Sequence, residues 1–347
     1  MHLHWKLLSF SIAVHLAVVV FPVDPVHAQQ LARAVTIGAN PPGSAFYSLA
    51  GGLSKVVTEA APFQMVVQPY TGSSTFLPLL NTGELDFGVV NGVETNLSYQ
   101  GPARFKAGGR NPFPHTPNTR LVMRGAPLLV GLLVKKDSPL KSVHDIKGKR
   151  VTGEYPAQLA VWYTMYSLLT TAGLSWSDVK VIPVPGANEG VDALVQDRAD
   201  VASGALNIAK VREADAAVGV RHLSADCSPE GDKRVRKAVP GAYTRIVKAG
   251  TALAVVEDAC IVVNDIYLST HRAAVDQVVA SVLKAIWDNV EKLSPLHPMF
   301  KEWTRERAVD PDVTIPYHPA AMQFYKERQL WSAKMDEAQR KLLALNP

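Results

Sequence analysis

The chain has 347 residues, of which 47% are hydrophobic and 19% charged, and its formal net charge at pH 7 is +5. This composition is typical of a globular protein and excludes an intrinsically disordered one. The excess of positive charge is small, and the basic residues are scattered along the chain. The only dense basic run, Lys233 to Lys237, has no aromatic interleaving, so we interpret it as a solvated loop or lobe surface and not as a nucleic-acid module.

Residues 1–28 have the pattern of a cleavable signal peptide. Lys6 precedes an apolar run from Leu7 to Phe21, and Val26-His-Ala28 places small residues where a signal peptidase reads them. The run is shorter than the roughly 20 residues of a spanning helix. The pattern predicts cleavage after Ala28 and a periplasmic protein that does not itself span the membrane. The alternative is an uncleaved N-terminal anchor.

Strand and helix patterns then alternate along the chain. The expected strands of the first third are 35–37, 63–69 and 87–90, and the expected helices are 44–59, 73–80 and one from about 92. This βαβ succession predicts an α/β fold with a largely parallel sheet, whose ligands bind at the carboxyl ends of the strands. Residues 101–118 are rich in proline and glycine and are expected to form a loop.

The same strand, loop and helix pattern recurs in the second third. Its expected strands are 128–134, 151–152, 179–184, 199–204, 220–223 and 253–263; its expected helices are a short one in 141–150, a long one ending near 169, 188–196 and 208–217. Helices are also expected over 272–292 and 319–345. The duplication predicts two lobes around a ligand cleft, lobe I of residues 30–126 and 255–347 and lobe II of residues 127–254.

The first strand-to-helix loop suits a polar or anionic ligand. Gly38 and Gly43 punctuate the turn, and Ser44 can cap the helix that carries Phe46 and Tyr47. A helix N-terminus presents unpaired amides and the positive end of the dipole. An ordinary loop with no ligand explains the stretch equally well. Of the two aromatic residues, we expect one to pack inward and the other to face the cleft.

Three stretches in register resemble one known family. They are Ile37-Gly-Ala-Asn-Pro-Pro-Gly-Ser-Ala-Phe-Tyr47, then Tyr70-Thr-Gly-Ser-Ser74 with Gly83-Glu-Leu-Asp-Phe-Gly88, and finally Pro316-Tyr-His-Pro-Ala-Ala321 with Phe324-Tyr325. Their order and spacing, from about residue 33 to 328, are similar to those of the TAXI-type solute receptors of tripartite ATP-independent periplasmic (TRAP) transporters. The resemblance implies a two-lobe fold of the type II periplasmic-binding-protein kind with a helical C-terminal segment. It also implies delivery of a solute to TRAP permease subunits.

Two loops depart from the family pattern. Asn40-Pro41-Pro42 replaces Gly-Gly-Thr and removes two amide donors, because proline has no N–H. Gly153-Glu-Tyr-Pro-Ala-Gln158 replaces Ala-Pro-Gly-Ser-Gly-Thr and adds the negative charge of Glu154. Members of the family are associated with acidic amino acids and dicarboxylates. Here we expect a small organic acid or amino-acid-like solute, held by hydroxyls and amides and not by one buried arginine.

The sequence offers little for catalysis or for a resident cofactor. It has no His-Glu-x-x-His, Cys-x-x-Cys or Gly-x-Ser-x-Gly, so we expect no metal, no cofactor and no enzyme. His318 is expected to be structural at a helix start, and Asp86 and Asp200 to hold turns. Cys227 and Cys260 can form a disulfide in an oxidising compartment, but a free buried thiol at Cys260 is equally natural.

We therefore interpret the chain as a solute receptor without chemistry of its own. A secreted enzyme or biosynthetic protein on the same scaffold is the alternative, and a sensor subunit for a membrane kinase is a third reading. The predicted ligand-binding residues all lie at expected strand ends or helix starts. They are Asn40, Ser44, Phe46, Tyr47, Thr71, Gly72, Ser73, Ser74, Asn91, Glu94, Glu154, Tyr155, Gln158 and Asn207.

Overall fold

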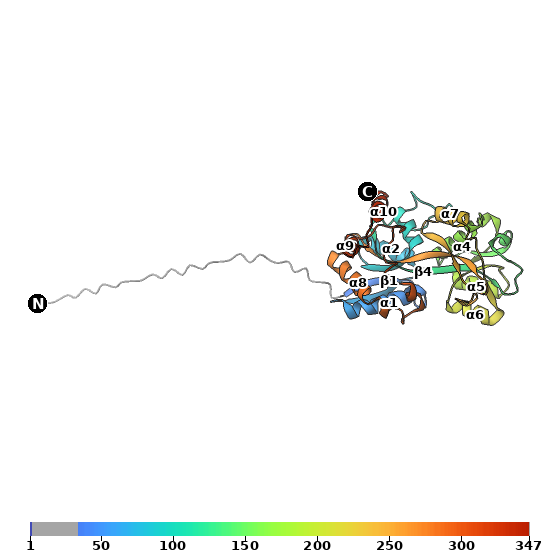
Figure 1. Ribbon diagram of the computed structural model, residues 1–347, viewed down its shortest axis with the longest axis horizontal. Helices are drawn as coiled ribbons and strands as arrows, with labels where there is room; N and C mark the ends of the chain where they lie inside the picture. The colour runs from blue at the N-terminus through green and yellow to red at the C-terminus, as the bar shows by residue number, and fades with distance from the viewer. Residues whose placement is uncertain (2–33, 347) are drawn as a thin grey trace. The chain divides into compact units, whose positions relative to one another are not determined.

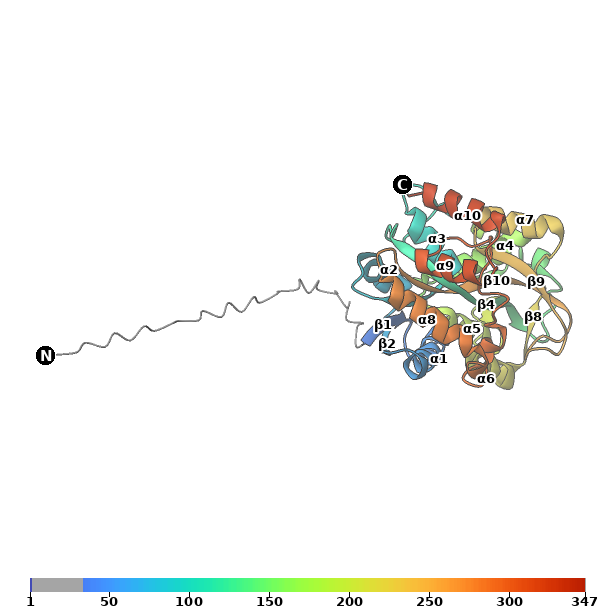
Figure 2. The ribbon, with the colours of Figure 1, turned by 60° about the vertical axis from the view of Figure 1, so that its left-hand side comes forward.

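A computed structural model describes Met1 and residues 34–346, shown as a ribbon in Figures 1 and 2. Apart from Met1, the predicted signal peptide over residues 1–28 lies outside the described residues. Within the described part of the chain, no helix combines the length and the apolarity that a membrane crossing requires.

The first third of the described chain alternates strands and helices, as the sequence predicts. Its elements are β1 (Ala34–Ala39), α1 (Ala45–Ala60), β2 (Gln64–Pro69), α2 (Ser73–Thr82), β3 (Phe87–Asn91) and α3 (Gly92–Gln100). Strand β1 lies between β2 and β3 and is parallel to both. Because parallel strands end at the same edge of a sheet, helices α1, α2 and α3 all begin at that edge.

Two long antiparallel strands, β4 (Thr119–Lys135) and β10 (Ala259–His271), join the two halves of the fold. One part of β10 pairs with β3, and the other part pairs with β9 (Ala242–Val247). The second half of β4 pairs with β7 (Ala202–Ala205) and β8 (Val220–Leu223). In Figure 1, β4 runs from the elements around α1 and α2 at the left toward those at the right. Both strands are almost wholly buried.

The second half of the fold surrounds the far ends of these strands. Its further elements are β5 (Arg150–Glu154), α4 (Leu159–Thr171), β6 (Lys180–Val184), α5 (Ala187–Val195), α6 (Ala209–Val218) and α7 (Pro229–Ala238). Strands β5 and β6 are parallel, and an isolated parallel bridge joins Val151 to Val201. The strand-loop-helix pattern of the first half is thus repeated.

The basic run Lys233 to Lys237 belongs to helix α7 on the surface, so of the two interpretations, a solvated loop or a lobe surface, the second agrees with the structure. Ser228 caps the helix by accepting a hydrogen bond from the Gly231 amide at 3.1 Å, and Pro229 starts it. Acidic residues occupy the first turn and basic residues the last, which complements the helix dipole. The sequence analysis did not predict this helix because the segment is densely charged.

Asp86 and Asp200 hold equivalent turns in the two halves, as predicted. Asp86 Oδ2 accepts hydrogen bonds from the backbone and the hydroxyl of Thr36, both at 2.8 Å. Asp200 accepts from the Arg150 backbone at 2.8 Å and from its guanidinium at 2.6 Å. In each half, a carboxylate at the start of one strand anchors the start of a neighbouring strand. Both residues are therefore structural.

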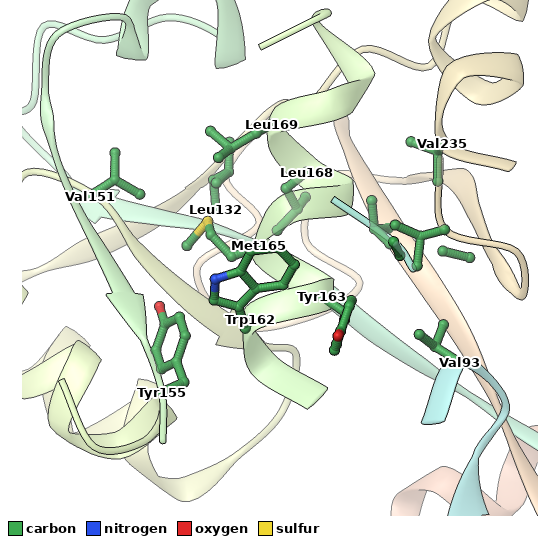
Figure 3. Packing of buried hydrophobic residues seen from close by; sticks show 14 of the residues in the cluster. Val93, Leu132, Val151, Tyr155, Trp162, Tyr163, Met165, Leu168, Leu169 and Val235 are labelled. Carbon is green, nitrogen blue, oxygen red and sulfur yellow. The ribbon is translucent and has the colours of Figure 1, made fainter. Parts of the chain in front are cut away.

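A large apolar cluster joins the two halves of the fold. Trp162 lies at its centre in Figure 3, beside Met165 and Leu168 of the same helix, α4. The cluster extends to Val93 of α3 and to Leu132 of β4. Burial of this continuous surface is a main favourable contribution to folding, at about 25 cal/mol per Å² of apolar area.

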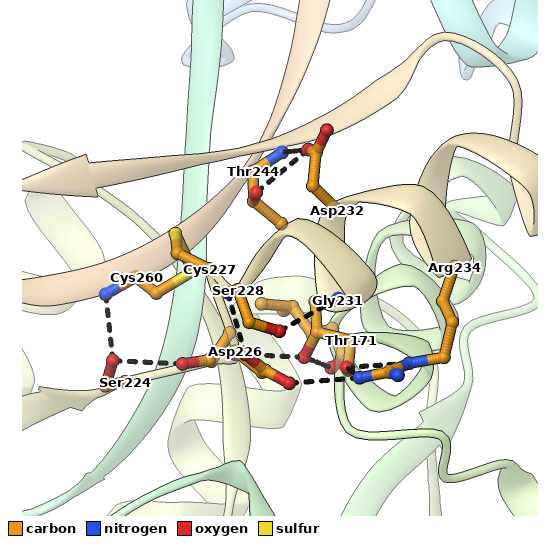
Figure 4. Close-up of a disulfide and its surroundings, with 12 residues drawn as sticks. Thr171, Ser224, Asp226, Cys227, Ser228, Gly231, Asp232, Arg234, Thr244 and Cys260 are labelled. Carbon is orange, nitrogen blue, oxygen red and sulfur yellow. Dashed lines mark hydrogen bonds and ion pairs between the residues drawn. A yellow bond between two sulfur atoms is a disulfide. The ribbon is translucent and has the colours of Figure 1, made fainter.

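Cys227 and Cys260 form a disulfide, which resolves the two alternatives left by the sequence. The bridge ties the loop before α7 to strand β10, as Figure 4 shows. Asp226, next to Cys227, accepts hydrogen bonds from the Ser228 amide at 2.8 Å and from Arg234 at 3.0 Å. The cross-link thus fixes a segment that is also held by polar contacts.

The C-terminal part is helical, but less continuously than predicted. Helix α8 (Asp276–Asp288) starts later than expected because β10 extends to His271. The expected single helix over 319–345 is two helices, α9 (Pro319–Glu327) and α10 (Ala333–Ala344), separated at Gln329, whose φ of 58° is left-handed. His318 caps α9 through Nδ1, which accepts from the Ala320 amide at 3.2 Å. Its predicted structural role is confirmed.

The ladder between β4 and β10 is irregular where the strands pass between the two halves. The register shifts between Asp265 and Tyr267 of β10. Asp265 pairs there with Arg124 and Arg307, each at 2.6 Å. A break in the ladder is where a paired strand bends most easily. The lobe boundaries themselves, near 126 and 255, stay a prediction.

Candidate functional site

A cavity of about 200 Å³ lies between the two halves of the fold. On one side it meets the starts of α1, α2 and α3, and on the other it meets β4, α4 and β7. It therefore opens at the carboxyl edge of the parallel strands, where the βαβ pattern places a ligand.

The first side of the cavity is polar, and we call it the polar wall. It consists of Asn40, Ser44, Thr71, Ser73, Ser74, Asn91 and Glu94. Three helix N-termini meet at this wall because each of the parallel strands is followed by its helix. Backbone amides and the positive ends of the helix dipoles are thereby directed toward one place.

The three helix starts differ in how their amides are satisfied. Ser44 Oγ accepts from the Tyr47 amide at 3.1 Å, and Asn91 Oδ1 accepts from the Val93 amide at 2.7 Å. Helix α2, in contrast, begins after Gly72, which has no side chain to cap it. Its first amides, those of Ser73 and Ser74, are the ones best placed to receive an anionic group of a ligand.

Glu94 is the only charged side chain among the described residues that line the cavity. It is 5% exposed, and its Oε1 accepts a hydrogen bond from Ser73 Oγ at 2.5 Å. Burial raises the pKa of Glu94 to about 7, against the opposing effect of hydrogen bonds from Ser73 and the Asn91 backbone. This carboxyl group therefore changes charge near neutral pH.

The opposite side of the cavity is apolar, and we call it the aliphatic wall. It consists of Leu128, Val130, Leu159, Val161 and Ile208. Small residues, Ala157, Ala160, Ala187 and Ala205, fill the spaces between them. This wall can exclude water from the body of a ligand and contact it by dispersion. Sequence reasoning missed it because apolar residues near strand ends resemble core residues.

A few polar groups interrupt the aliphatic wall. Gln158 Oε1 accepts from the Ala187 amide at 2.9 Å and so occupies the first amide of α5. Thr164 Oγ1 accepts from Asn264 at 3.2 Å and donates to the Ala160 carbonyl at 3.1 Å. The carbonyl oxygen of Gln158 and the hydroxyl of Thr164 are thus engaged within the protein, unlike the amides at the start of α2.

The structure brings most of the predicted ligand-binding residues together. The ones that line the cavity are Asn40, Ser44, Phe46, Thr71, Gly72, Ser73, Ser74, Asn91, Glu94 and Gln158. Phe46 lines the cavity, whereas Tyr47 does not line it and is half-buried, so the inward packing expected for one of the pair stays a prediction. Asn207 lines a neighbouring cavity of about 430 Å³.

Glu154 and Tyr155 do not reach the cavity, in contrast to the sequence interpretation. Both have left-handed backbones, with φ of 66° and 48°, and this turn points them away from it. Tyr155 is fully buried, and its hydroxyl lies 2.6 Å from Thr152 Oγ1. Glu154 is exposed. Their side-chain directions depended on the local backbone, which the sequence spacing could not indicate.

No group of three His, Cys, Asp or Glu residues within the described chain is arranged to hold a metal ion. The described lining of the cavity also contains no Lys, Arg or His. Arg124, on β4, pairs instead with Asp265 and Asp310. What the cavity offers is hydroxyls, amides, one titratable carboxyl group and an apolar surface.

The described chain thus has an α/β fold of two lobes with a cavity between them. A solved structure described as a periplasmic transporter has a TM-score of 0.53 and 14% identity, over 91% of this chain and 98% of that one. This likeness supports the fold.

Two further structures are similar at a lower level. The aliphatic sulphonate binding protein SsuA of Escherichia coli has a TM-score of 0.49 and 15% identity, over 90% of this chain and 99% of that one. A TctC solute binding protein from Polaromonas has a TM-score of 0.49 and 11% identity, over 91% and 98%. By sequence, residues 37–328 match the NMT1-like family, and the chain belongs to that family.

Proposed function

We propose that this protein is a periplasmic receptor that captures a small organic acid in the cavity and delivers it to the membrane subunits of a TRAP transporter. The observation that carries the proposal is the contrast between the two walls. One wall concentrates helix N-termini and hydroxyls, and the other is aliphatic. An anionic head and an apolar body match these two surfaces.

The head group is best accommodated at the start of α2. The amides of Ser73 and Ser74 are the first of an uncapped helix, and the Ser74 and Thr71 side chains line the same place. Backbone amides and hydroxyls of this kind bind carboxylates without a cationic side chain. We therefore retain the ligand class predicted from the sequence, an organic acid that is held without a buried arginine.

The body of the ligand lies against Leu128, Val130 and Ile208 in this proposal. The sequence interpretation included Tyr155 and Gln158 among the ligand-binding residues of this side. The position of Tyr155 in the core and the bond of Gln158 to α5 favour the aliphatic wall instead. A short aliphatic or aromatic monocarboxylate fits a cavity of about 200 Å³ better than a long or highly polar molecule.

Export is the second part of the proposal. The pattern of residues 1–28 supports cleavage after Ala28. Sequencing the N-terminus of the protein recovered from the periplasm should find Gln29 first. A membrane-bound form that begins at Met1 would show an anchored protein instead.

Binding without turnover is the central test. Mass spectrometry of the native protein should detect a copurified organic acid. Calorimetry with hexanoate and benzoate should give binding with one ligand per chain, and NMR should show the acid unchanged after prolonged incubation. Formation of a product would favour the alternative, an enzyme on the same scaffold. Absence of binding by the acids would contradict an acid receptor.

Closure around the ligand and delivery to a permease need separate experiments. Lobes of residues 30–126 with 255–347 and of residues 127–254 should approach one another on binding. Small-angle scattering should then show a smaller radius of gyration with saturating acid. Uptake by proteoliposomes that contain the TRAP permease should require this protein and an ion gradient but no ATP. Uptake that depends on ATP would assign a different transporter.

A further inference from the structure

We propose that an organic anion enters this cavity together with one proton, which Glu94 carries in the complex. The inference rests on the proposed function, because it concerns the same cavity and the same class of ligand. It makes Glu94 a residue that determines which form of ligand is accepted, a role that neither the fold nor the family assigns.

The position of Glu94 is the first ground for the proposal. Its side chain is almost fully buried in the polar wall, and its Oε1 is 2.5 Å from Ser73 Oγ. Ser73 is also the first residue of α2, where the head group of an acid would bind. The ligand carboxylate and Glu94 therefore compete for the same small region.

The second ground is that the described residues lining the cavity include no Lys, Arg or His to compensate two negative charges. Helices α2 and α4 and strands β3 and β7 contain no Asp, Glu, Lys, Arg or His, although α4 contributes Tyr163 and Tyr166. The start of α1 contributes Tyr47. The titratable groups of β10, which packs against α3, are Asp265, Tyr267 and His271. Asp265 is already paired with Arg124 and Arg307.

The consequence follows from simple electrostatics. Two carboxylates that share one buried region repel each other much more strongly than they would in water, because the effective dielectric constant is lower there. A proton on Glu94 removes that repulsion. It also turns the Glu94 oxygen into a donor and releases the Ser73 hydroxyl hydrogen, which otherwise points to Glu94, for the ligand. One proton thus changes an anion-repelling site into an anion-binding one.

The direction of the pH effect is defined. The pKa of Glu94 is raised to about 7, so the free protein loses this proton as the pH rises through neutrality. Simple carboxylic acids titrate at about pH 4, so the ligand stays ionised above pH 6. If the complex requires the proton, the dissociation constant should increase about a hundredfold between pH 6 and pH 9.

Calorimetry on the full mature protein tests this with hexanoate and benzoate as probes. Titrations at pH 6, 7, 8 and 9, in two buffers of different ionisation enthalpy, measure the affinity and the protons taken up. We expect uptake of about 0.9 proton per acid at pH 8, where a group with a pKa near 7 is mostly ionised. Hexanamide and benzamide, which carry no charge, should show no rise in dissociation constant with pH.

Glu94→Gln removes the titrating group and keeps its size. This variant should bind both acids with a nearly constant affinity from pH 6 to 9 and take up no proton. Glu84→Gln is the matched control, because Glu84 is exposed at the opposite end of α2. It should retain the wild-type pH dependence. Thermal unfolding of both variants verifies that they are folded.

The outcomes separate the two proposals. If the acids bind equally well at all four pH values without proton uptake, the proton-linked mechanism is wrong and the receptor function stands. The same holds if Glu94→Gln keeps the wild-type pH dependence. If neither acid binds at any pH while the protein is folded, the proposed function fails and the linkage fails with it.

Discussion

The polar wall and the aliphatic wall face the same cavity but are built in opposite ways. The polar wall is made of helix starts, each placed by a parallel strand of the first half. The aliphatic wall is made of side chains from β4, α4 and the start of α6. In the proposed function, the polar wall selects a ligand by directed hydrogen bonds and the aliphatic wall by the exclusion of water.

In the proposed function, charge recognition is therefore concentrated in one half of the molecule. Amides at a helix start are held by the backbone and cost little to position. The aliphatic wall can then lower the local polarity and strengthen those contacts.

Removal of the disulfide should destabilise the protein without altering recognition. Cys260 is two residues from Val262, which pairs with Val130 of the aliphatic wall. The cross-link spans 33 residues, so Cys227→Ala with Cys260→Ala should lower the free energy of unfolding by about 3–4 kcal/mol. Urea unfolding measures this loss. Benzoate affinity at 25 °C should change less than threefold; a larger loss would make the disulfide part of the site.

The stability of the ligand-free protein should fall as the pH rises from 5 to 8. The pKa of Glu94 is raised from 4.5 to about 7, so between these values the folded state keeps a proton that the unfolded state has lost. Raising the pH removes this advantage, which amounts to roughly 3 kcal/mol. In the Glu94→Gln variant, the free energy of unfolding, measured with urea at each pH, should vary much less with pH. An unchanged slope in this variant would place the titrating group elsewhere.

A negative charge on the aliphatic wall should weaken the binding of an organic anion more than an uncharged polar side chain does. Leu128 is half-buried, so Leu128→Glu can fold while placing a carboxylate opposite the polar wall. We expect benzoate affinity to fall about a hundredfold through repulsion and loss of apolar contact. Leu128→Gln, the uncharged control, should lose clearly less. Equal losses in both variants would indicate that shape and not charge governs this wall.

Loss of one hydroxyl from the polar wall should have the smallest effect. Ser74→Ala removes a hydroxyl at the start of α2 and should weaken benzoate binding on the order of tenfold, near 1.5 kcal/mol. Thr82→Ala at the other end of the same helix is the control and should bind normally. Normal binding by Ser74→Ala would leave recognition to the α2 amides alone.

Much of the fold could be predicted from the sequence because its signals are local. The βα alternation from β1 to α3 follows from apolar runs, glycines and caps such as Ser44 and Asn91. The roles of Asp86, Asp200 and His318 were predicted from their positions at strand and helix starts. Helix α7 and strand β9 were missed, because a charged helix and a short edge strand have weak hydrophobic patterns.

Sequence patterns alone therefore predicted the α/β class and the residues that form the polar wall of the cavity. Which side chains face one another across the cavity depends on tertiary contacts. The tertiary structure placed Tyr155 in the core, brought Leu128 and Ile208 opposite Ser74, and buried Glu94 against Ser73. Sequence patterns that indicate strands and helices involve residues that are only a few positions apart. Side-chain direction and pKa depend instead on neighbours that are distant in the chain.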